Sequence, residues 1–326
     1  MTILVTGAAG FIGSHLAERL CCRGDDIVGL DNFNDYYDPA RKRANEKRLN
    51  EYPNFRMIEA DVRDRERIAA ILADHAITRV AHLAAMAGVR NAVTHPDLYV
   101  NVNLNGTQNL LDAARATGKV ENFVFASTSS VYGNTTQIPF VETDPCDRPL
   151  QPYAAAKRAA EILGYSYHHL FGQNFTVLRF FTVYGPNGRP DMMAYLLADS
   201  LMKGRDIPLY DNGQMYRDWT FVDDTVSGIV AALDRPLGYE IINLGRGEPV
   251  LLANFVALME EISGRPANVI PTPRLAADFV RNEADISKAR RLLDYQPSVS
   301  VAEGVRQISR IIQVWHIAVE IGRAHV

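Results

Sequence analysis

Residues 5–15 read Val5-Thr6-Gly7-Ala8-Ala9-Gly10-Phe11-Ile12-Gly13-Ser14-His15 and directly follow the apolar segment Ile3-Leu4. The three glycines, spaced Gly-x-x-Gly-x-x-Gly, predict a tight turn between a first strand and a first helix. Such a turn lets a pyrophosphate approach the helix N-terminus, whose free N–H groups and partial positive charge favour an anion. The alternative is a glycine-rich turn without a ligand. The stretch predicts the first β–α unit of a parallel sheet that binds a dinucleotide.

An acidic residue completes this pattern. Asp31 stands at the end of a second predicted strand, Ile27–Leu30, 24 residues after Gly7. A carboxylate at this place accepts hydrogen bonds from the adenosine ribose hydroxyls and repels a 2′-phosphate. The alternative is that Asp31 only begins the following loop. Together with the glycine turn, Asp31 favours NAD over NADP as the cofactor.

The composition limits the class of protein. The chain has 326 residues, 47% hydrophobic and 22% charged, with a net charge of −4, so it has no general attraction for nucleic acid or anionic lipid. No apolar run approaches the roughly 18 residues of a membrane span. Because Cys21, Cys22 and Cys146 lack metal or disulfide spacing and the chain opens directly on a predicted core strand, we expect a cytoplasmic protein without a signal peptide. The eight histidines show no ligand spacing, so no metal is expected.

Strand-like and helix-like segments alternate through the first half of the chain. Further predicted strands are Phe55–Glu59, Arg79–Leu83, Phe123–Ala126 and Thr176–Arg179. Predicted helices are Leu16–Cys22, Arg63–Ala73, Tyr99–Thr117 and Tyr153–Phe171. Strands separated by helices of this length pair in parallel, and apolar runs without alternation fit strands buried on both faces. The predicted fold class is α/β, a doubly wound parallel sheet of the Rossmann type.

The second half has a different character. Prolines punctuate shorter elements after residue 185, with predicted strands near Ile207–Leu209 and Glu240–Leu244. The predicted helices are Met192–Lys203, Asp223–Leu233, Leu252–Ser263, Ser287–Leu293 and Val301–Val314. We expect residues 1–180 to form the dinucleotide-binding domain with the catalytic residues. Residues 181–320 are expected to form mainly a smaller substrate-binding lobe over the carboxyl edge of the sheet, where ligands of such sheets bind.

Two segments carry the predicted chemistry. Ser127–Gly133 is rich in hydroxyls and follows a predicted strand, and Tyr153-Ala154-Ala155-Ala156-Lys157 opens a helix. Residues four apart lie on one face of a helix, so Lys157 stands one turn from Tyr153. An ammonium beside a phenol stabilises the phenolate and lowers its pKa, which predicts a general base. A lone Tyr-x-x-x-Lys is weak, but here it occurs in a chain that opens with a dinucleotide turn.

These motifs together resemble the extended short-chain dehydrogenase/reductases, a family of nucleotide-sugar epimerases and dehydratases, over nearly the whole chain. The resemblance implies a tightly held NAD used as a transient hydride store, with Tyr153, Lys157 and Thr128 as catalytic residues. Asp61 and Val62 match residues that flank the adenine, and Asn103 matches one near the active-site water. The implied NAD contacts are Gly7, Gly10, Phe11, Ile12, Gly13, Asp31, Asn32, Asp61, Val62, Leu83, Ala84, Ala85, Asn103, Tyr153 and Lys157.

Ser129 and Ser130 indicate which reaction the family resemblance implies. The 4,6-dehydratases of the family carry Asp-Glu at these two positions, and the decarboxylating UDP-xylose synthases carry Glu at the second. Hydroxyls can orient a substrate, as Thr128 is expected to do beside Tyr153, but they cannot supply an acid–base pair. Epimerisation is therefore favoured over dehydration and decarboxylation.

The segment Gly188-Arg189-Pro190-Asp191-Met192 is similar to one in UDP-glucuronate 4-epimerases, where the arginine meets the sugar carboxylate. A planar guanidinium can bind a carboxylate through two hydrogen bonds. The alternative for Arg189 is a loop arginine paired with Asp191. The resemblance further implies sugar or phosphate contacts from Arg90, a pyrophosphate contact from Arg217 and a ribose contact from Asp278. The implied substrate-binding residues are Arg90, Thr128, Ser129, Ser130, Thr182, Arg189, Arg217 and Asp278.

The resemblance thus implies epimerisation of UDP-glucuronate at C4 by a homodimer. A UDP-glucose or UDP-N-acetylhexosamine 4-epimerase is the alternative in the same class, and a UDP-glucuronate decarboxylase is less favoured. A protein that binds NAD but has lost the chemistry is a further alternative, against which the intact Thr128, Tyr153 and Lys157 argue. Side chains that could serve a dimer interface, or pack within the protein instead, are Tyr99, Leu104, Leu111, Ile162, Tyr165 and Tyr167.

Overall fold

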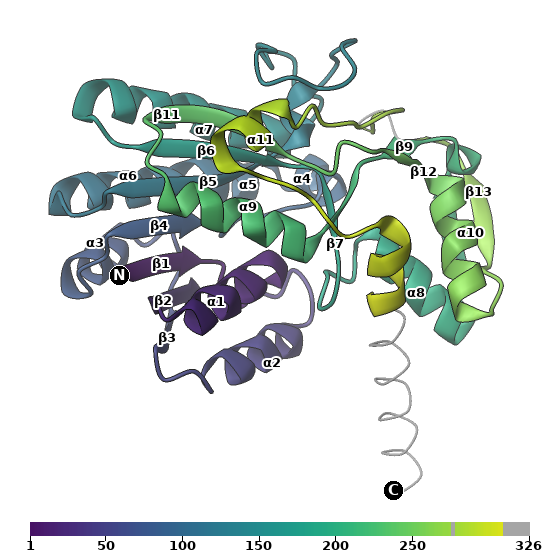
Figure 1. Ribbon diagram of the computed structural model, residues 1–326, viewed down its shortest axis with the longest axis horizontal. Coiled ribbons are helices and arrows are strands. Elements are labelled where there is room, and N and C mark those ends of the chain that lie inside the picture. Colours follow the sequence, from purple (N-terminus) through teal and green to yellow (C-terminus); the bar gives the residue numbers. More distant parts are fainter. Residues whose placement is uncertain (275–277, 309–326) are drawn as a thin grey trace, which may run out of the picture.

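A seven-stranded parallel sheet forms the centre of the protein (Figure 1). The computed structural model describes residues 1–274 and 278–308, with Arg90 described by its backbone only. The strand order is β11-β6-β5-β4-β1-β2-β3, and every neighbouring pair is parallel. The strands are β1 (Thr2–Thr6), β2 (Asp26–Asp31), β3 (Phe55–Glu59), β4 (Arg79–His82), β5 (Asn122–Thr128), β6 (Phe175–Phe180) and β11 (Tyr239–Leu244). The predicted doubly wound sheet is confirmed.

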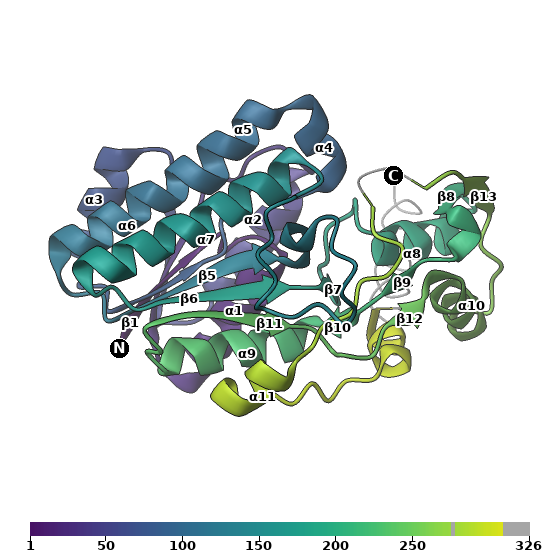
Figure 2. The same cartoon turned by 90° about the horizontal axis from the view of Figure 1, so that it is seen from above.

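Helices cover both faces of this sheet (Figure 2). α1 (Phe11–Arg23) and α9 (Val222–Asp234) pack together on one face, whereas α3 (Arg65–Asp74), α6 (Gly106–Thr117) and α7 (Pro152–Phe171) cover the other. Alternate residues of β1 therefore enter different cores: Ile3 and Val5 pack on the α1 side, and Leu4 on the α3 side. Because both faces are buried, the strands read as continuous apolar runs.

The sequence analysis missed α2 (Pro39–Leu49). This helix has charged residues on most of its surface and buries only Lys42, Asn45 and Leu49, so it shows no apolar stripe. Its local start signal is nevertheless present, because the Asp38 side chain accepts a hydrogen bond from the Ala40 N–H and proline occupies the first turn.

The long helix predicted over Tyr99–Thr117 is divided into three parts. α5 (Pro96–Val100) passes through a π-helical turn, η1 (Asn101–Asn105), into α6. Gly106, which follows the turn, lies so close to Val62 that a Cβ there would come within 2.6 Å of the valine Cγ2. The wider turn brings Asn103 into the interior, where it is fully buried.

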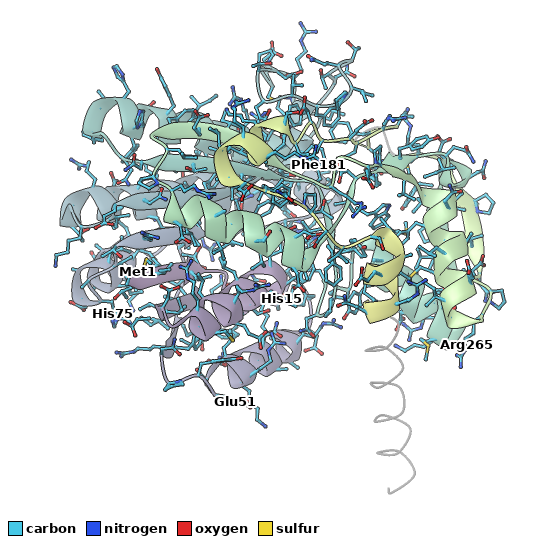
Figure 3. The ribbon with its side chains drawn as sticks, in the orientation of Figure 1. Met1, His15, Glu51, His75, Phe181 and Arg265 are labelled. Atoms are coloured by element: carbon cyan, nitrogen blue, oxygen red, sulfur yellow. The ribbon has the colours of Figure 1, made fainter. Side chains whose placement is uncertain are left out.

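Most of the remaining elements form a lobe at the carboxyl edge of the sheet and the segments leading to it. The helices and helical turns are α4 (Val89–Thr94), η2 (Ser129–Tyr132), α8 (Met193–Lys203), η3 (Asp211–Gly213), α10 (Leu252–Ser263) and α11 (Ser287–Leu293). Of these, α4 packs against α7, and α11 against β11. The strands are β7 (Thr182–Tyr184), β8 (Ile207–Tyr210), β9 (Tyr216–Arg217), β10 (Trp219–Phe221), β12 (Val250–Leu251) and β13 (Val269–Thr272). Residues 301–308 are helical, and the rest of the last predicted helix lies outside the described residues. Figure 3 labels Met1 at the sheet end of the molecule and Arg265 at the lobe end.

Three elements assigned to the lobe by sequence belong to the sheet layers instead, and one of them is α11, which contacts β11 and α9. The predicted strand Glu240–Leu244 is β11, which pairs with β6 at the sheet edge, and the predicted helix Asp223–Leu233 is α9, which packs against α1. Each carries a strong local pattern, but nothing local tells which neighbour it will pack against. The division at residue 180 into a dinucleotide-binding part and a substrate-binding part remains a prediction about function. It is not a division of the fold, because the chain returns to the sheet after that residue.

Candidate active site

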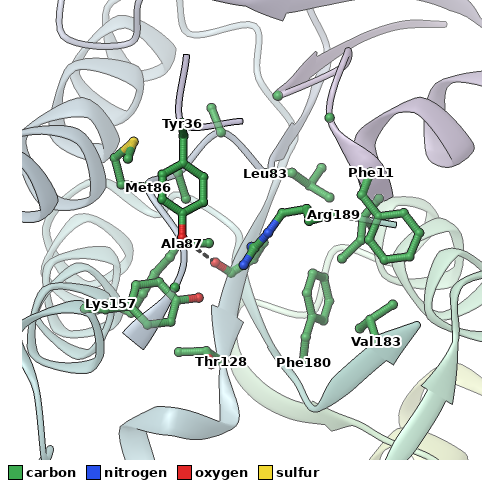
Figure 4. Close-up of a pocket in the computed structure, with 18 of the residues that line it drawn as sticks. Phe11, Tyr36, Leu83, Met86, Ala87, Thr128, Lys157, Phe180, Val183 and Arg189 are labelled. Atoms are coloured by element: carbon green, nitrogen blue, oxygen red, sulfur yellow. Dashed lines mark hydrogen bonds between the residues drawn. The ribbon is translucent and has the colours of Figure 1, made fainter. Parts of the chain in front are cut away.

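A cavity of about 800 Å³ lies at the carboxyl ends of the strands, between the sheet and the lobe (Figure 4). It brings together most of the predicted site residues, although they come from positions 7 to 278 of the chain. Those that line it are Gly7, Gly10, Phe11, Ile12, Gly13, Asp31, Asn32, Val62, Leu83, Ala84, Ala85, Thr128, Ser129, Ser130, Tyr153, Lys157, Thr182, Arg189, Arg217 and Asp278. Asp61 and Asn103 stand behind the lining, and the Arg90 side chain lies outside the described part of the structure.

The glycine turn forms a cradle that side chains would fill. A Cβ on Gly7, which has φ +72°, would lie 2.9 Å from the Ala84 nitrogen, and one on Gly13 would lie 2.1 Å from the Gly7 oxygen. No side chain caps the N-terminus of α1 at Gly10, and the first turn contains no acidic residue. The N–H groups of Phe11, Ile12 and Gly13, at the start of α1, have no partner in the described structure and are available to an anion, so the cradle fits the pyrophosphate of a dinucleotide.

Asp31 stands at the cavity with its side chain held in place. Its carboxylate accepts hydrogen bonds from the N–H groups of Ala9 (3.2 Å) and Phe33 (2.9 Å). Lys42 Nζ lies 3.6 Å from the same carboxylate and donates to Asn34, and burial lowers the pKa of this lysine. Sequence reasoning missed Lys42, because nothing in the charged segment around it distinguishes one lysine from the next.

Asp61 acts on the cavity through Asn32. Its carboxylate forms hydrogen bonds with Arg63 and accepts one from Asn32 Nδ2 at 2.8 Å. The Arg63 guanidinium holds the pKa of Asp61 at about 2. Asp61 is therefore ionised at neutral pH and orients Asn32, which lines the cavity.

Asn103 holds the loop that follows β4. Its side chain amide donates to the Met86 carbonyl and accepts from the Met86 N–H, both at 2.9 Å. Behind it, Thr107 donates to the Asn103 carbonyl (2.6 Å) and must therefore accept from Nε2 of buried His82 (3.0 Å), whose Nδ1 accepts from Thr6 (2.7 Å). This chain of hydrogen bonds ties the π turn to the strand ends that line the cavity.

Tyr153 and Thr128 face each other in the cavity. Burial raises the pKa of the Tyr153 phenol, and the neighbouring Thr128 hydroxyl and the positive charge of Arg189 act in the opposite direction. The expectation that Lys157 lowers this pKa is not met, because the Lys157 ammonium does not act on the phenol here and donates to the Ala126 carbonyl instead. The Tyr153 ring also packs edge-on against Tyr99, with 6.0 Å between ring centroids.

Lys157 is buried beneath the cavity, with 2% of its surface exposed. Its Nζ donates to the Ala126 carbonyl at 2.8 Å and lies 4.6 Å from the centre of the Phe125 ring. Burial lowers the pKa of Lys157 to about 7, against the opposing charge of Glu161. Glu161 itself is bound in a fully buried ion pair with Arg179 at 2.8 Å and accepts a hydrogen bond from Ser127.

The strand end after β5 presents hydroxyl groups to the cavity. Thr128 Oγ1 donates to Ser130 Oγ at 3.2 Å, and Asn282 Nδ2 donates to Ser129 Oγ at 2.9 Å. Asn282, from the segment that closes the cavity, was not predicted, because it has no local motif. Among the described lining residues the carboxylates are Asp31, Asp191 and Asp278, so none belongs to this strand end.

Arg189 lines the cavity but is already paired. Its Nε and a terminal nitrogen donate to the two oxygens of Asp191 at 3.0 and 2.9 Å. Its side chain keeps 22% of its surface exposed. The alternative that Arg189 pairs with Asp191 is therefore confirmed, whereas its contact with a sugar carboxylate stays a prediction, for which it lies in the cavity lining.

Arg217 and Asp278 close the opposite part of the cavity. Arg217 donates to the carbonyls of Tyr216 and Phe279, both at 2.9 Å, and burial lowers its pKa. The charge of Asp278 opposes that lowering. These backbone contacts orient the Arg217 guanidinium in the cavity lining. Its positive charge is only partly neutralised by its neighbours, so an anionic group bound in the cavity would stabilise it.

Residues 3–245 match the NAD dependent epimerase/dehydratase family. The chain belongs to this family.

Individual members of the family resemble the chain over most of its length. The UDP-glucuronate 4-epimerase of Thermodesulfobacterium geofontis is 41% identical over 305 residues, which covers 93% of this chain and 94% of the relative. The crystal structure of the Bacillus cereus UDP-glucuronic acid 4-epimerase with UDP-glucuronic acid and NAD has a TM-score of 0.90 and 36% identity, covering 97% of this chain and all of that one. The dTDP-glucose 4,6-dehydratase of Streptomyces venezuelae, crystallised with NAD, reaches 0.89 at 29% identity, covering 96% and 97%. Within this epimerase/dehydratase family, then, the fold alone does not separate the reactions.

Within residues 1–274 and 278–308, no helix combines the length and apolar character needed to cross a bilayer. In the same part of the chain, no group of three or more His, Cys, Asp or Glu side chains is arranged to hold a metal ion.

Proposed function

We propose that this chain is a UDP-glucuronate 4-epimerase, which interconverts UDP-glucuronate and UDP-galacturonate through a 4-keto sugar. The observation that carries the proposal is that Tyr153, Thr128 and Arg189 line one cavity, in which the strand end after β5 presents hydroxyls and no carboxylate. Relatives that share the family and about 40% of the sequence carry this activity in their names.

NAD is the proposed cofactor. The glycine cradle would hold its pyrophosphate, Asp31 its adenosine ribose, and Lys157 its nicotinamide ribose. When bound, NAD supplies the acceptor and donor of the C4 hydride and a positive charge. Because no net redox change occurs, we expect NAD to remain bound through purification and to be released on denaturation. Release of no NAD, with full activity on added NADP, would contradict this assignment.

Tyr153 is the proposed acid–base residue. Its hydroxyl oxygen would take the proton from the C4 hydroxyl and later return it. The neighbouring Thr128 hydroxyl, by turning its hydrogen from Ser130 to Tyr153, would stabilise the phenolate form, and it can orient the sugar hydroxyl. Lys157, with a pKa of about 7, can hold or release a proton near neutrality, at the base of the cavity.

Ser129 and Ser130 support epimerisation over elimination. Loss of water or carbon dioxide needs an acid–base group beside the reacting carbons, and the hydroxyls of this strand end have pKa values far from neutrality. The epimerase must instead leave room for the 4-keto sugar to turn, so that the hydride returns to its other face.

A second candidate is epimerisation of a neutral hexose on UDP. The observation that favours it is the Arg189–Asp191 pair, which leaves this wall of the cavity without net charge. Arg189→Ala separates the two candidates. For UDP-glucuronate we expect kcat/KM to fall at least tenfold, since losing a charged partner in a desolvated site costs ~2–5 kcal/mol.

The test of the main proposal is incubation of the purified enzyme with a panel of UDP-sugars, followed by NMR. UDP-galacturonate formed from UDP-glucuronate is the expected product. UDP-xylose as the main product would instead identify a decarboxylase, and no product from any sugar would identify a silent NAD-binding protein. Equal losses for UDP-glucuronate and UDP-glucose in Arg189→Ala would mean that Arg189 holds the loop or a phosphate.

We further propose that the protein is a cytoplasmic homodimer. Ile162 and Tyr165 leave 52% of their surface exposed on α7, close to exposed Leu170 and Phe171. Tyr99 and Leu111, also considered for an interface, are fully buried in the monomer and cannot serve it. Three free cysteines fit a reducing compartment. Light scattering of wild type and of Ile162→Glu, which we expect to dissociate the dimer, tests the assembly.

A further inference from the structure

Arg189 is held by two residues to which the proposed function gives no role. Asp191 binds it through both carboxylate oxygens, and the Tyr36 hydroxyl donates to Asp191 Oδ2 at 3.1 Å. All three side chains line the cavity, and Figure 4 shows Tyr36 and Arg189 pointing toward one another, with Thr128 and Lys157 in the lower part of the view. We call Tyr36 and Asp191 the clamp.

The clamp lies where three distant segments meet. A Cβ on Gly88 would come within 2.4 Å of the Tyr36 hydroxyl and 3.7 Å of Asp191 Oδ2, so the clamp packs directly on the loop after β4. Arg41 donates to the Gly188 carbonyl at 3.1 Å and thereby ties α2 to the segment that carries Arg189. The position of Asp191 is therefore set by tertiary contacts and not only by its closeness to Arg189 in sequence.

The pairing occupies one of the two edges by which an arginine can bind a carboxylate. That edge is formed by Nε and one terminal nitrogen, and both donate to Asp191. Burial opposes ionisation of Asp191, but the hydrogen bonds and charge of Arg189 outweigh burial and lower its pKa, so the carboxylate is charged at neutral pH. A second carboxylate would meet attraction from Arg189 and repulsion from Asp191 at nearly the same place.

We propose that Asp191, supported by Tyr36, is an internal competitor for Arg189, and that a sugar carboxylate binds by displacing it. The inference rests on the proposed function, in which Arg189 binds a uronate. With the clamp on Arg189, the wall is neutral and suits an uncharged hexose. With Asp191 displaced, the wall is cationic and suits a uronate. Asp191 thus sets the selectivity between charged and neutral sugars.

Binding measurements test the clamp without depending on turnover. In the Tyr153→Phe background, the dissociation constants of UDP-glucuronate and UDP-glucose are measured by calorimetry for the parent, Asp191→Asn and Tyr36→Phe. We expect the ratio of the UDP-glucuronate constant to the UDP-glucose constant to fall about tenfold in Asp191→Asn, which corresponds to about 1.4 kcal/mol. Tyr36→Phe, which leaves the carboxylate but removes its support, should lower the ratio by a smaller factor.

The control is Asp191→Asn in an Arg189→Ala background, where no competition for Arg189 exists and only the direct repulsion by Asp191 is removed, so that the ratio should fall much less than tenfold. An unchanged or increased ratio in Asp191→Asn would overturn the proposal, because Asp191 would then position Arg189 for the substrate. A tenfold fall that persists without Arg189 would overturn it as well. If Asp191→Asn does not fold, the direction of the Tyr36→Phe change decides. Failure of the proposed function shows itself separately, as wild-type enzyme that does not turn over UDP-glucuronate.

Discussion

Lys157 should make the NAD-free protein less stable at neutral pH than at alkaline pH. In the unfolded chain a lysine has a pKa near 10.5, whereas burial lowers the pKa of Lys157 to about 7 in the fold. Between these two values the unfolded chain binds a proton that the folded protein does not, so stability rises with pH across this range. Below pH 7 both states hold the proton, and the dependence disappears.

The magnitude follows from the same two values. One proton contributes at most about 1.4 kcal/mol per pH unit. Because Lys157 is still partly protonated near pH 7.5, we expect the free energy of unfolding to gain about 2 kcal/mol between pH 7.5 and pH 9 from this residue. Lys157→Met lacks the titrating group and should lose that gain. The variant should therefore be more stable than wild type at pH 7, by an amount that shrinks as the pH rises.

Urea unfolding of the NAD-free wild type and Lys157→Met at pH 7.5, 8.25 and 9 measures this difference. NAD must be removed first, because a ligand that binds the folded state adds its own stabilisation. Exposed Lys119→Met is the matched control and should leave the pH dependence as in wild type. A difference between Lys157→Met and wild type that stays constant over the three pH values would refute the reasoning.

Two further predictions concern the wall of the cavity, and a third concerns the buried ion pair behind it. Tyr153→Phe should lower kcat by about 10²–10⁴-fold while NAD and UDP-sugar still bind, since it removes only the proton acceptor; a variant that keeps more than about a tenth of the rate would make Thr128 or a water the base instead. Ser130→Glu should increase the release of carbon dioxide from UDP-glucuronate, measured as UDP-pentose by NMR, because it introduces an acid–base group beside the sugar; an unchanged product mixture would count against the role given to this position. Glu161→Ala should destabilise the protein by about 3–5 kcal/mol in urea unfolding, because it leaves the fully buried Arg179 without its carboxylate. Glu161→Gln keeps the shape and one acceptor and should cost less; equal losses for the two variants would show that packing rather than charge dominates.

Local patterns predicted the sheet and the cofactor turn. Some features depend only on residues that are close together in the sequence, and these can be recognised without the structure. They are the apolar runs of strand length, the start and stop signals of helices, and the spacing of Gly7, Gly10 and Gly13. The helices α10 and α11 have the predicted bounds. The missed α2 has a cap but no apolar stripe, and the π turn at Asn101–Asn105 depends on packing against Val62.

The catalytic pair Tyr153 and Lys157 was also readable from sequence, because one turn of helix separates them. The pKa shifts of these two side chains could not be predicted from the sequence, since burial raises the pKa of Tyr153 and lowers that of Lys157. Desolvation depends on everything that surrounds a side chain, and that is assembled only when the sheet and lobe close together.

The sequence by itself determined the α/β class, the dinucleotide turn, the Tyr-x-x-x-Lys pair and the candidate arginine. Only the tertiary structure decided what Arg189 contacts: Tyr36 lies 155 positions before Asp191, and the two meet because the loops after parallel strands converge on one edge of the sheet. The same convergence placed Asn282 on Ser129, 153 positions away, and moved β11 from the expected lobe to the sheet. Spacing along the chain specifies which elements form, but the partners of a side chain depend on which elements pack together, and that is set by the burial of the whole core.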